Sequence, residues 1–238
     1  MSKVPGVNSR IYIAGYDLSG SYNKISPDMA RELRDVTGFG DSGHKYFPLM
    51  QNDAFSLSGY YEGGAGEVDE VMQGLINQSQ TLWHCVNGYA VGDRAYCLYA
   101  ILEKYTINSP VLDIVLIDAN FKGVGQMYDC TILAAKTAII ADGESAGLDG
   151  AAATASGAVA FLQVFACGAD DALIVTIEDD DNAGFLTPNT LITFTTAAGI
   201  TDEKKEVTGA VQRYVRAVWN GSEPWAATFA VGFHRILD

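Results

Sequence analysis

Hydrophobic and polar residues alternate along much of this chain with a period of two, which is typical of β-strands. The alternation is clear at residues 10–16 and 54–61, and residues 111–121 are apolar on both faces, which indicates a central strand. Aromatic content favours a strand over a helix at residues 94–105. Further strands are expected at residues 80–87, 130–140, 158–166, 172–178, 191–196, 206–219 and 228–236.

One segment, residues 67–78, has the period of a helix instead. Its first turn is acidic, which suits the positive end of the helix dipole. No helical pattern follows Gly157. The apolar positions that would share one helix face and pack into a core are Val68, Val71, Met72, Leu75 and Ile76.

The segments between these elements suggest how the chain is divided. Residues 17–27 are rich in turn formers, and residues 29–36 fit either a short strand or a single helical turn. Residues 141–157 consist mostly of Ala, Gly, Ser and acids, which is a break in composition. We therefore expect a β domain at residues 1–141, a linker or long loop at residues 142–157 and a small antiparallel β-sandwich at residues 158–238.

Composition favours a packed protein that meets copies of itself. Of the 238 residues, 48% are hydrophobic and only 18% are charged, so a packed core is expected and general disorder is not. With so few charges, the surface must be completed by Ser, Thr, Asn, Gln and Gly. Such surfaces often belong to chains that bury much of themselves against identical neighbours, although secreted β-proteins share them.

The net charge of −14 argues against nucleic-acid binding through phosphate neutralisation, which needs basic patches. Residues 1–141 carry 10 basic and 15 acidic side chains, and residues 142–238 carry 5 and 14. A surface of like charge could instead repel phosphates and let DNA pass without sticking, but the charge alone favours the simpler interpretation of a soluble acidic protein. The sequence has no apolar run of about 18 residues and no signal-peptide pattern, so no association with a membrane is expected.

Metal sites and cofactors are not expected. The acidic residues 178–181, with Asp170 and Asp171, could offer oxygen ligands to calcium, but a solvated turn between strands is favoured. The four cysteines are widely spaced and do not combine with histidines at zinc-ligand spacing, so free thiols are expected.

No catalytic motif is visible, and we do not expect an enzyme. His44, His84 and His234 lie in no recognisable acid–base motif, and the sequence has no G-x-S-x-G nucleophile elbow. Trp219 and Trp225 flank a turn, where they could either bind a sugar or cap the core of a sandwich.

The most informative stretch is residues 33–61, in which an acidic turn and a polar, Gly-rich loop precede a strand. Nothing in this stretch suits chemistry. A long loop of small residues ahead of a strand instead predicts a part that docks on a neighbouring copy. The residues expected to form this inter-subunit contact are Thr37, Gly38, Phe39, Gly40, Asp41, Ser42, Gly43, His44, Lys45, Tyr46 and Phe47.

Residues 35–61 resemble the major tail (tail tube) proteins of long-tailed bacteriophages in their Val-Thr…Gly-Asp…Tyr-Phe-Pro-Leu…Phe-Ser-Leu-Ser-Gly-Tyr pattern. The resemblance continues through the helix at residues 67–78 and the strand that ends near Gly125, so it covers about residues 10–130. The second half is similar to β-sandwich modules appended to virion proteins, whereas the simplest tail tube proteins end after the first domain.

The resemblance implies a mainly β fold: a tail-tube-like β-sandwich or barrel with one flanking α-helix, followed by the small antiparallel sandwich. It also implies a structural virion protein, made in the host cytoplasm, whose copies form hexameric rings that stack into a hollow tube. The loop 37–47 would be a ring-to-ring contact. The partners of the protein would be other copies of itself, other tail proteins, and DNA that passes through a negative lumen without specific binding.

Three alternatives remain open, of which the least favoured is a hydrolase with dispersed catalytic residues, since no motif supports it. Three chains with two barrels each could form a ring with pseudo-sixfold symmetry, although the sequence shows no second helix. The chain could also be a capsid decoration protein, or a virion protein that binds host-surface glycans through its aromatic turn.

Overall fold

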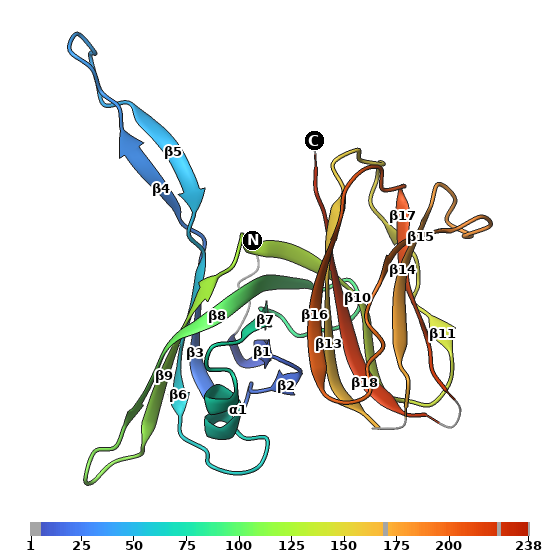
Figure 1. The fold of residues 1–238 in the computed structure, drawn as a ribbon, viewed down its shortest axis with the longest axis horizontal. Helices are drawn as coiled ribbons and strands as arrows, with labels where there is room; N and C mark the ends of the chain where they lie inside the picture. The colour runs from blue at the N-terminus through green and yellow to red at the C-terminus, as the bar shows by residue number, and fades with distance from the viewer. Residues whose placement is uncertain (1–5, 169–170, 223–224, 238) are drawn as a thin grey trace. The chain divides into compact units, whose positions relative to one another are not determined.

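The computed structural model describes residues 6–168, 171–222 and 225–237. The chain is mainly β, with antiparallel sheets and one α-helix, which confirms the fold class expected from the sequence. It divides into two compact units, and strand β8 (Arg94–Asn108) runs from one into the other (Figure 1). Unit 2 comprises Ser21–Ser79 and Leu98–Met127, and unit 1 comprises the rest. Among the described residues, none of the helices reaches the length and apolarity of a membrane span.

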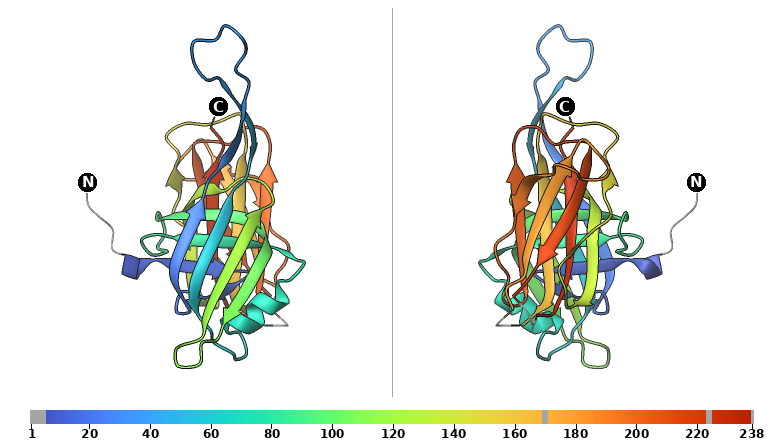
Figure 2. Two further views of the ribbon diagram at one scale, coloured as in Figure 1. Left: turned by 90° about the vertical axis from the view of Figure 1, so that its left-hand side faces the viewer. Right: turned by 90° about the vertical axis from the view of Figure 1, so that its right-hand side faces the viewer.

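Unit 2 is built around a four-stranded antiparallel sheet in the order β3-β6-β9-β8 (Figure 2). Alternate residues such as Phe55, Leu57 and Phe121 are buried on one face. Helix α1 (Val68–Gly74) lies on this face, where the hydroxyl of Tyr105 on β8 donates to its Asp69 at 3.1 Å. The other strands of this sheet are β3 (Tyr22–Asp28), β6 (Ala54–Tyr60) and β9 (Leu116–Gly123).

The helix is shorter than residues 67–78, where the sequence predicts it. It buries Val68, Val71 and Met72, as the stripe of apolar residues predicts, but it ends at Gly74. Asn77 has a φ of 64°, which no α-helix continues, and Ile76 is exposed.

Unit 1 contains a β-sandwich. Its first sheet has the order β16-β13-β18-β10, and in its second sheet β17 pairs with β11, β12 and β14, and β14 pairs with β15. The core between them includes Ile177, Trp219 and Phe229. The strands are β10 (Tyr128–Ile139), β11 (Gly143–Glu144), β12 (Leu148–Asp149), β13 (Ala158–Cys167), β14 (Ile174–Asp180), β15 (Asn189–Thr193), β16 (Thr201–Val207), β17 (Tyr214–Asn220) and β18 (Ala227–Arg235).

The N-terminal elements form a second core on the other face of the first sheet. Tyr12 packs its ring 4.9 Å from that of Phe165. Gln163 is fully buried, donates to the carbonyl of Thr81 at 3.0 Å and accepts from the amide of Gly15, so its amide group is satisfied. The elements on this side of the sheet are the 3₁₀ turn η1 (Gly6–Asn8), β1 (Arg10–Ile13), β2 (Tyr16–Asp17) and β7 (Ser79–Cys85).

Stability is expected to depend on the ionisation of Asp202 in this core. Burial raises the pKa of this carboxyl above its usual range, although the amide of Thr81 donates to it and lowers the pKa. A raised pKa in the folded state means that stability falls as pH rises through that value. Asp202→Asn should therefore raise the melting temperature above that of the unaltered chain at pH 7, and this gain should be smaller at pH 4. Melting curves of both proteins across this pH range would measure the difference. A variant with an unchanged pH profile would contradict this prediction.

Three segments differ from the sequence prediction, and in a fourth the structure decides between two alternatives. Residues 17–27 were expected to be turns, but most of β3 lies there because it pairs with β6. Residues 29–36, expected to be either a short strand or a single helical turn, contain strand β4. Strand β9 begins at Leu116 rather than residue 111, because residues 109–115 form the loop after β8. Residues 206–219 contain the end of β16 and most of β17, with Gly209 at a φ of 99° between them.

The division into domains that the sequence predicts, with boundaries at residues 141 and 158, stays a prediction. Two short strands, β11 and β12, lie in the segment expected to be a linker or long loop, and both pair with β17. Strand β10, from the first expected domain, pairs with β18. The compact units therefore follow non-local strand pairing rather than the break in composition.

Candidate assembly surface

The connection between β3 and β6 is a long β-hairpin, residues 29–52, which we call the arm. Its strands β4 (Arg31–Asp35) and β5 (Tyr46–Gln51) form a two-stranded sheet of their own, which projects from unit 2 (Figure 1). Leu33 is opposite Pro48, and Arg34 is opposite Phe47. Successive residues of a strand point to opposite faces, so Leu33 and Pro48 lie on one face of the arm and Phe47 lies on the other. Both faces of the arm therefore carry apolar side chains.

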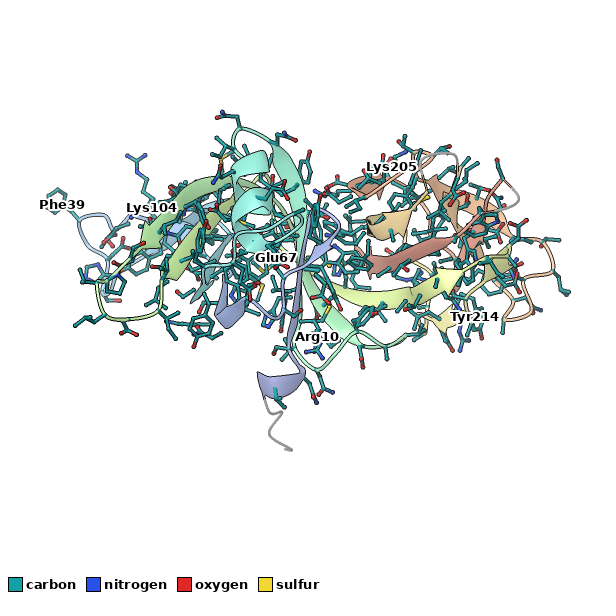
Figure 3. The ribbon with its side chains drawn as sticks, turned by 90° about the horizontal axis from the view of Figure 1, so that it is seen from below. Arg10, Phe39, Glu67, Lys104, Lys205 and Tyr214 are labelled. Atoms are coloured by element: carbon teal, nitrogen blue, oxygen red, sulfur yellow. The ribbon has the colours of Figure 1, made fainter. Side chains whose placement is uncertain are left out.

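These apolar side chains are exposed to an unusual degree. Phe39 at the tip is fully exposed, and Met50 is 84% exposed (Figure 3 shows Phe39 at the outer end of the arm). Burying one such side chain is worth about 2 kcal/mol, and contiguous apolar surface of this kind marks an interaction site. The exposed large apolar residues of the arm are Met29, Leu33, Val36, Phe39, Tyr46, Phe47, Leu49 and Met50.

The root of the arm is held by Asp53, which is only 1% exposed. Its carboxylate accepts hydrogen bonds from the amide of Ala30 at 3.1 Å, the side chain of Gln51 at 2.9 Å and the amide of Met127. Its carbonyl accepts from the amide of Gly123 at 2.9 Å. One buried side chain therefore ties both strands of the arm to the turn after β9.

Asp53→Ala is expected to destabilise unit 2, because it leaves two backbone N–H groups without an acceptor. At 1–3 kcal/mol for each group, the cost is about 2–6 kcal/mol, which should lower the melting temperature by roughly 5–25 °C. Limited proteolysis should also cut the arm faster. Asp28→Ala, a loss of an exposed carboxylate nearby, is the matched control. Equal stability of the two variants would contradict the assigned role of Asp53.

The tip of the arm is ordered by its own hydrogen bonds. Asp35 accepts from the amide of Thr37 at 2.9 Å, and His44 lies 3.0 Å away. The hydroxyl of Thr37 accepts from the amide of Lys45 at 3.0 Å. The hydrogen bonds from Thr37, and to a lesser extent the one with His44, lower the pKa of Asp35. The carboxylate therefore stays ionised and keeps these bonds at any pH above its ordinary range.

A second carboxylate shapes the turn around Phe39. Asp41 pairs with Lys45 and accepts from the amide of Gly38 at 2.8 Å, and both interactions lower its pKa. Gly40 has a φ of 100°, which favours glycine. These interactions fix the backbone of the turn that carries Phe39, which reduces the backbone entropy that binding would cost.

The residues predicted from the sequence as an inter-subunit contact all lie together at the end of the arm. Residues 37–45 form its tip, while Tyr46 and Phe47 begin β5. Their role in assembly stays a prediction. The sequence patterns did not predict β5, its exposed Leu49 and Met50, or the root residue Asp53. The five-residue run Tyr-Phe-Pro-Leu-Met was the available signal for β5.

Away from α1, the sheet of unit 2 presents a polar face. Its residues come from alternate positions on all four strands, and Ser58 on β6 donates to Asp118 on β9 at 2.6 Å. Among the described residues, β3 pairs with β6 alone, whereas β8 pairs with β9 in unit 2 and also with β10 and β7. The sheet therefore has an open edge along β3 and a second one toward the end of β8. The polar residues of this face are Lys24, Ser26, Asp28, Ser56, Ser58, Lys104, Thr106, Asp118, Asn120 and Lys122. The strand register also places the exposed Tyr60, Ile101 and Leu116 on it.

The acidic turn at residues 178–181 does not gather its carboxylates around one point. Asp179 accepts from the amide of Gln212 at 2.6 Å, and Glu178 bonds to Arg216 at 2.9 Å. Backbone donors satisfy Asp180 and lower its pKa. The described residues include no group of three or more side chains placed to hold a metal, and Asp170 lies outside them.

The other candidate side chains are distributed through the fold. His44 is at the tip of the arm, and burial lowers the pKa of both His84 and His234. Trp219 and Trp225 are 4% and 3% exposed, so they complete the sandwich core and do not offer a surface to a sugar. The described structure therefore does not bring the three histidines together.

No protein-family model matches this chain, and no curated protein matches its sequence. Several solved structures show a limited similarity to this chain. The tail of an empty gene transfer agent particle, refined with C6 symmetry, is 11% identical, with a TM-score of 0.42 over 53% of this chain and 98% of that one. The SPP1 tail tube is 14% identical, with a TM-score of 0.44 over 53% and 80%. The SPP1 Dit protein, described as a paradigm of the hub adsorption apparatus, is 10% identical, with a TM-score of 0.37 over 96% and 99%.

Proposed function

We propose that this chain is a structural subunit of a phage-like tail, that unit 2 assembles with copies of itself into a ring, and that rings stack into a tube that conducts DNA. The single observation that carries the proposal is the sheet of unit 2, which has one covered face, one polar face and two open edges. The subunit would work in the virion, after synthesis in the host cytoplasm, with other tail proteins as partners and without enzymatic activity.

The strand directions of unit 2 suit a closed ring. Four antiparallel strands alternate in direction, so β3 and β8 at the two edges run in opposite senses. When β8 of one copy lies beside β3 of the next, the new pair is also antiparallel, and the alternation continues around any number of copies. Ring closure pairs every edge, which removes the unpaired backbone groups that otherwise promote aggregation. Six copies are the proposed number.

In such a ring the polar face of unit 2 would line the channel, since the opposite face is covered by α1. This face carries Lys24, Lys104 and Lys122 together with Asp28 and Asp118, among serine, threonine and asparagine side chains. We therefore propose a nearly neutral lining, which differs from the negative lumen expected from the net charge. Short polar side chains and balanced charges would offer DNA few fixed phosphate contacts.

Electron microscopy of the purified chain is the decisive test, with its mass in solution measured in parallel. Rings with a central channel that stack into tubes are the expected result. Rings that remain single would instead assign the chain to a ring at the end of a tube, as in a tail hub. A chain that stays monomeric at every concentration, with no ring in the particle, would refute the proposal. Binding to capsids without rings would favour the decoration protein.

A further inference from the structure

The loop between β8 and β9, residues 109–115, is a second exposed apolar surface in unit 2; we call it the apolar loop. Val111 and Leu112 are 97% and 98% exposed, and Ile114 is 61% exposed. Asp113 is the one charged residue in the loop. Connections between strands are usually built from Gly, Asn, Asp and Ser, so three large aliphatic side chains in water need a partner to explain them.

The arm and the apolar loop lie at opposite ends of the same sheet. At one end, Asp28, which precedes the arm, is opposite Ala54, and Ala54 is opposite Lys122. At the other end, Tyr60 is opposite Leu116, which follows the apolar loop. The strands therefore run from the arm at one end to the apolar loop at the other (Figure 1).

On the basis of the proposed ring assembly, we propose that the apolar loop is the docking site for the arm of a second copy in the adjacent ring. Two different surfaces at opposite ends of one sheet make a head-to-tail contact, which cannot close between two copies and therefore repeats along the strand direction. Phe39 and its apolar neighbours would be buried against Val111, Leu112 and Ile114.

Charge also favours a second copy as the occupant. The chain carries a net charge of −14, so two copies repel each other overall. The arm, residues 29–52, contains three basic and three acidic side chains and is therefore neutral with histidine uncharged. It is a segment that can approach an acidic copy without a like-charge penalty. Arg34, beside Phe47 on one face of the arm, could pair with Asp113.

A photoreactive phenylalanine analogue in place of Phe39 tests which residues the tip meets. After irradiation of the assembled protein, mass spectrometry should find links from position 39 to residues 111–114 of another copy. The same sample diluted to monomers should give no such links. Links that map elsewhere on the neighbouring copy, or rings that never stack, would overturn the proposed pairing.

Leu112→Asp tests the docking site separately from ring formation. Rings should form as in the unaltered chain, because the open edges are untouched, while the fraction of stacked rings should fall at least tenfold. Leu186→Asp is the matched control, since Leu186 is 77% exposed in unit 1 and should leave stacking unchanged. Normal stacking by Leu112→Asp would overturn this inference and leave the ring proposal intact. Loss of rings from the unaltered chain itself would refute the ring proposal.

Discussion

Ile107→Pro is expected to abolish ring formation while the isolated chain remains folded. Ile107 lies near the end of β8, at an open edge of unit 2, and is 44% exposed. Proline cannot donate a backbone hydrogen bond, so it blocks a strand from pairing on the side where its N–H would point. The expected loss is complete, because every contact between neighbours in the ring would contain the substitution.

The hydrogen bonds of the sheet show which way the N–H of Ile107 points. The amide of Gly123 donates to Asp53 beside β6, whereas the amide of Val124 donates to Tyr99 on β8. The backbone groups of odd-numbered residues of β9, including Ile117, therefore form hydrogen bonds with β6. Ile107 on β8 is opposite Ile117, so this pair shares no hydrogen bond, and the N–H of Ile107 points away from β9, toward the open edge.

Ile107→Ala is the matched control, since it removes the same side chain and keeps the N–H. It should form rings, and circular dichroism and unfolding curves should show that both variants are folded. Electron microscopy and mass in solution at equal protein concentrations measure the outcome. Rings formed by the proline variant would show that this edge of β8 is not the ring contact.

Removal of the arm should give rings that do not stack. Replacing residues 31–51 by two glycines joins Ala30 to Asn52, which already share a backbone hydrogen bond of 2.7 Å, so a tight hairpin turn can close the gap. The deletion removes seven of the eight exposed large apolar side chains of the arm. At about 2 kcal/mol for each buried side chain, in every copy of a ring, the effect on stacking should be close to total.

Phe39→Ser provides a graded version of the same experiment. It keeps the arm and removes only the ring at its tip, so stacking should weaken and require a higher protein concentration. Sedimentation measures the concentration at which tubes appear. Tubes formed by the deletion variant at the same concentration as by the full chain would exclude the arm as a stacking contact.

Local patterns in the sequence were sufficient for much of the fold. Alternating burial at residues 54–60 and the apolar stripe of α1 both follow from short-range periodicity, because a half-buried strand or helix repeats its pattern within a few residues. The exposed loop at residues 37–45 could also be predicted, since Gly, Ser and Asp there favour turns. Its role as a contact stays a prediction.

The tertiary structure decided which apolar residues are core and which are surface. Residues 111–114 were expected to lie in a buried central strand, and Tyr46–Gln51 was not expected to be a strand. Both are apolar and yet largely exposed, because no other segment of the described chain covers them. Burial depends on partners distant in sequence, such as β10 pairing with β18, and a local pattern does not contain that information. The sequence by itself thus determined a mainly β chain with one helix and a polar, Gly-rich loop. Only the tertiary structure placed that loop on a projecting arm, opposite a second apolar surface.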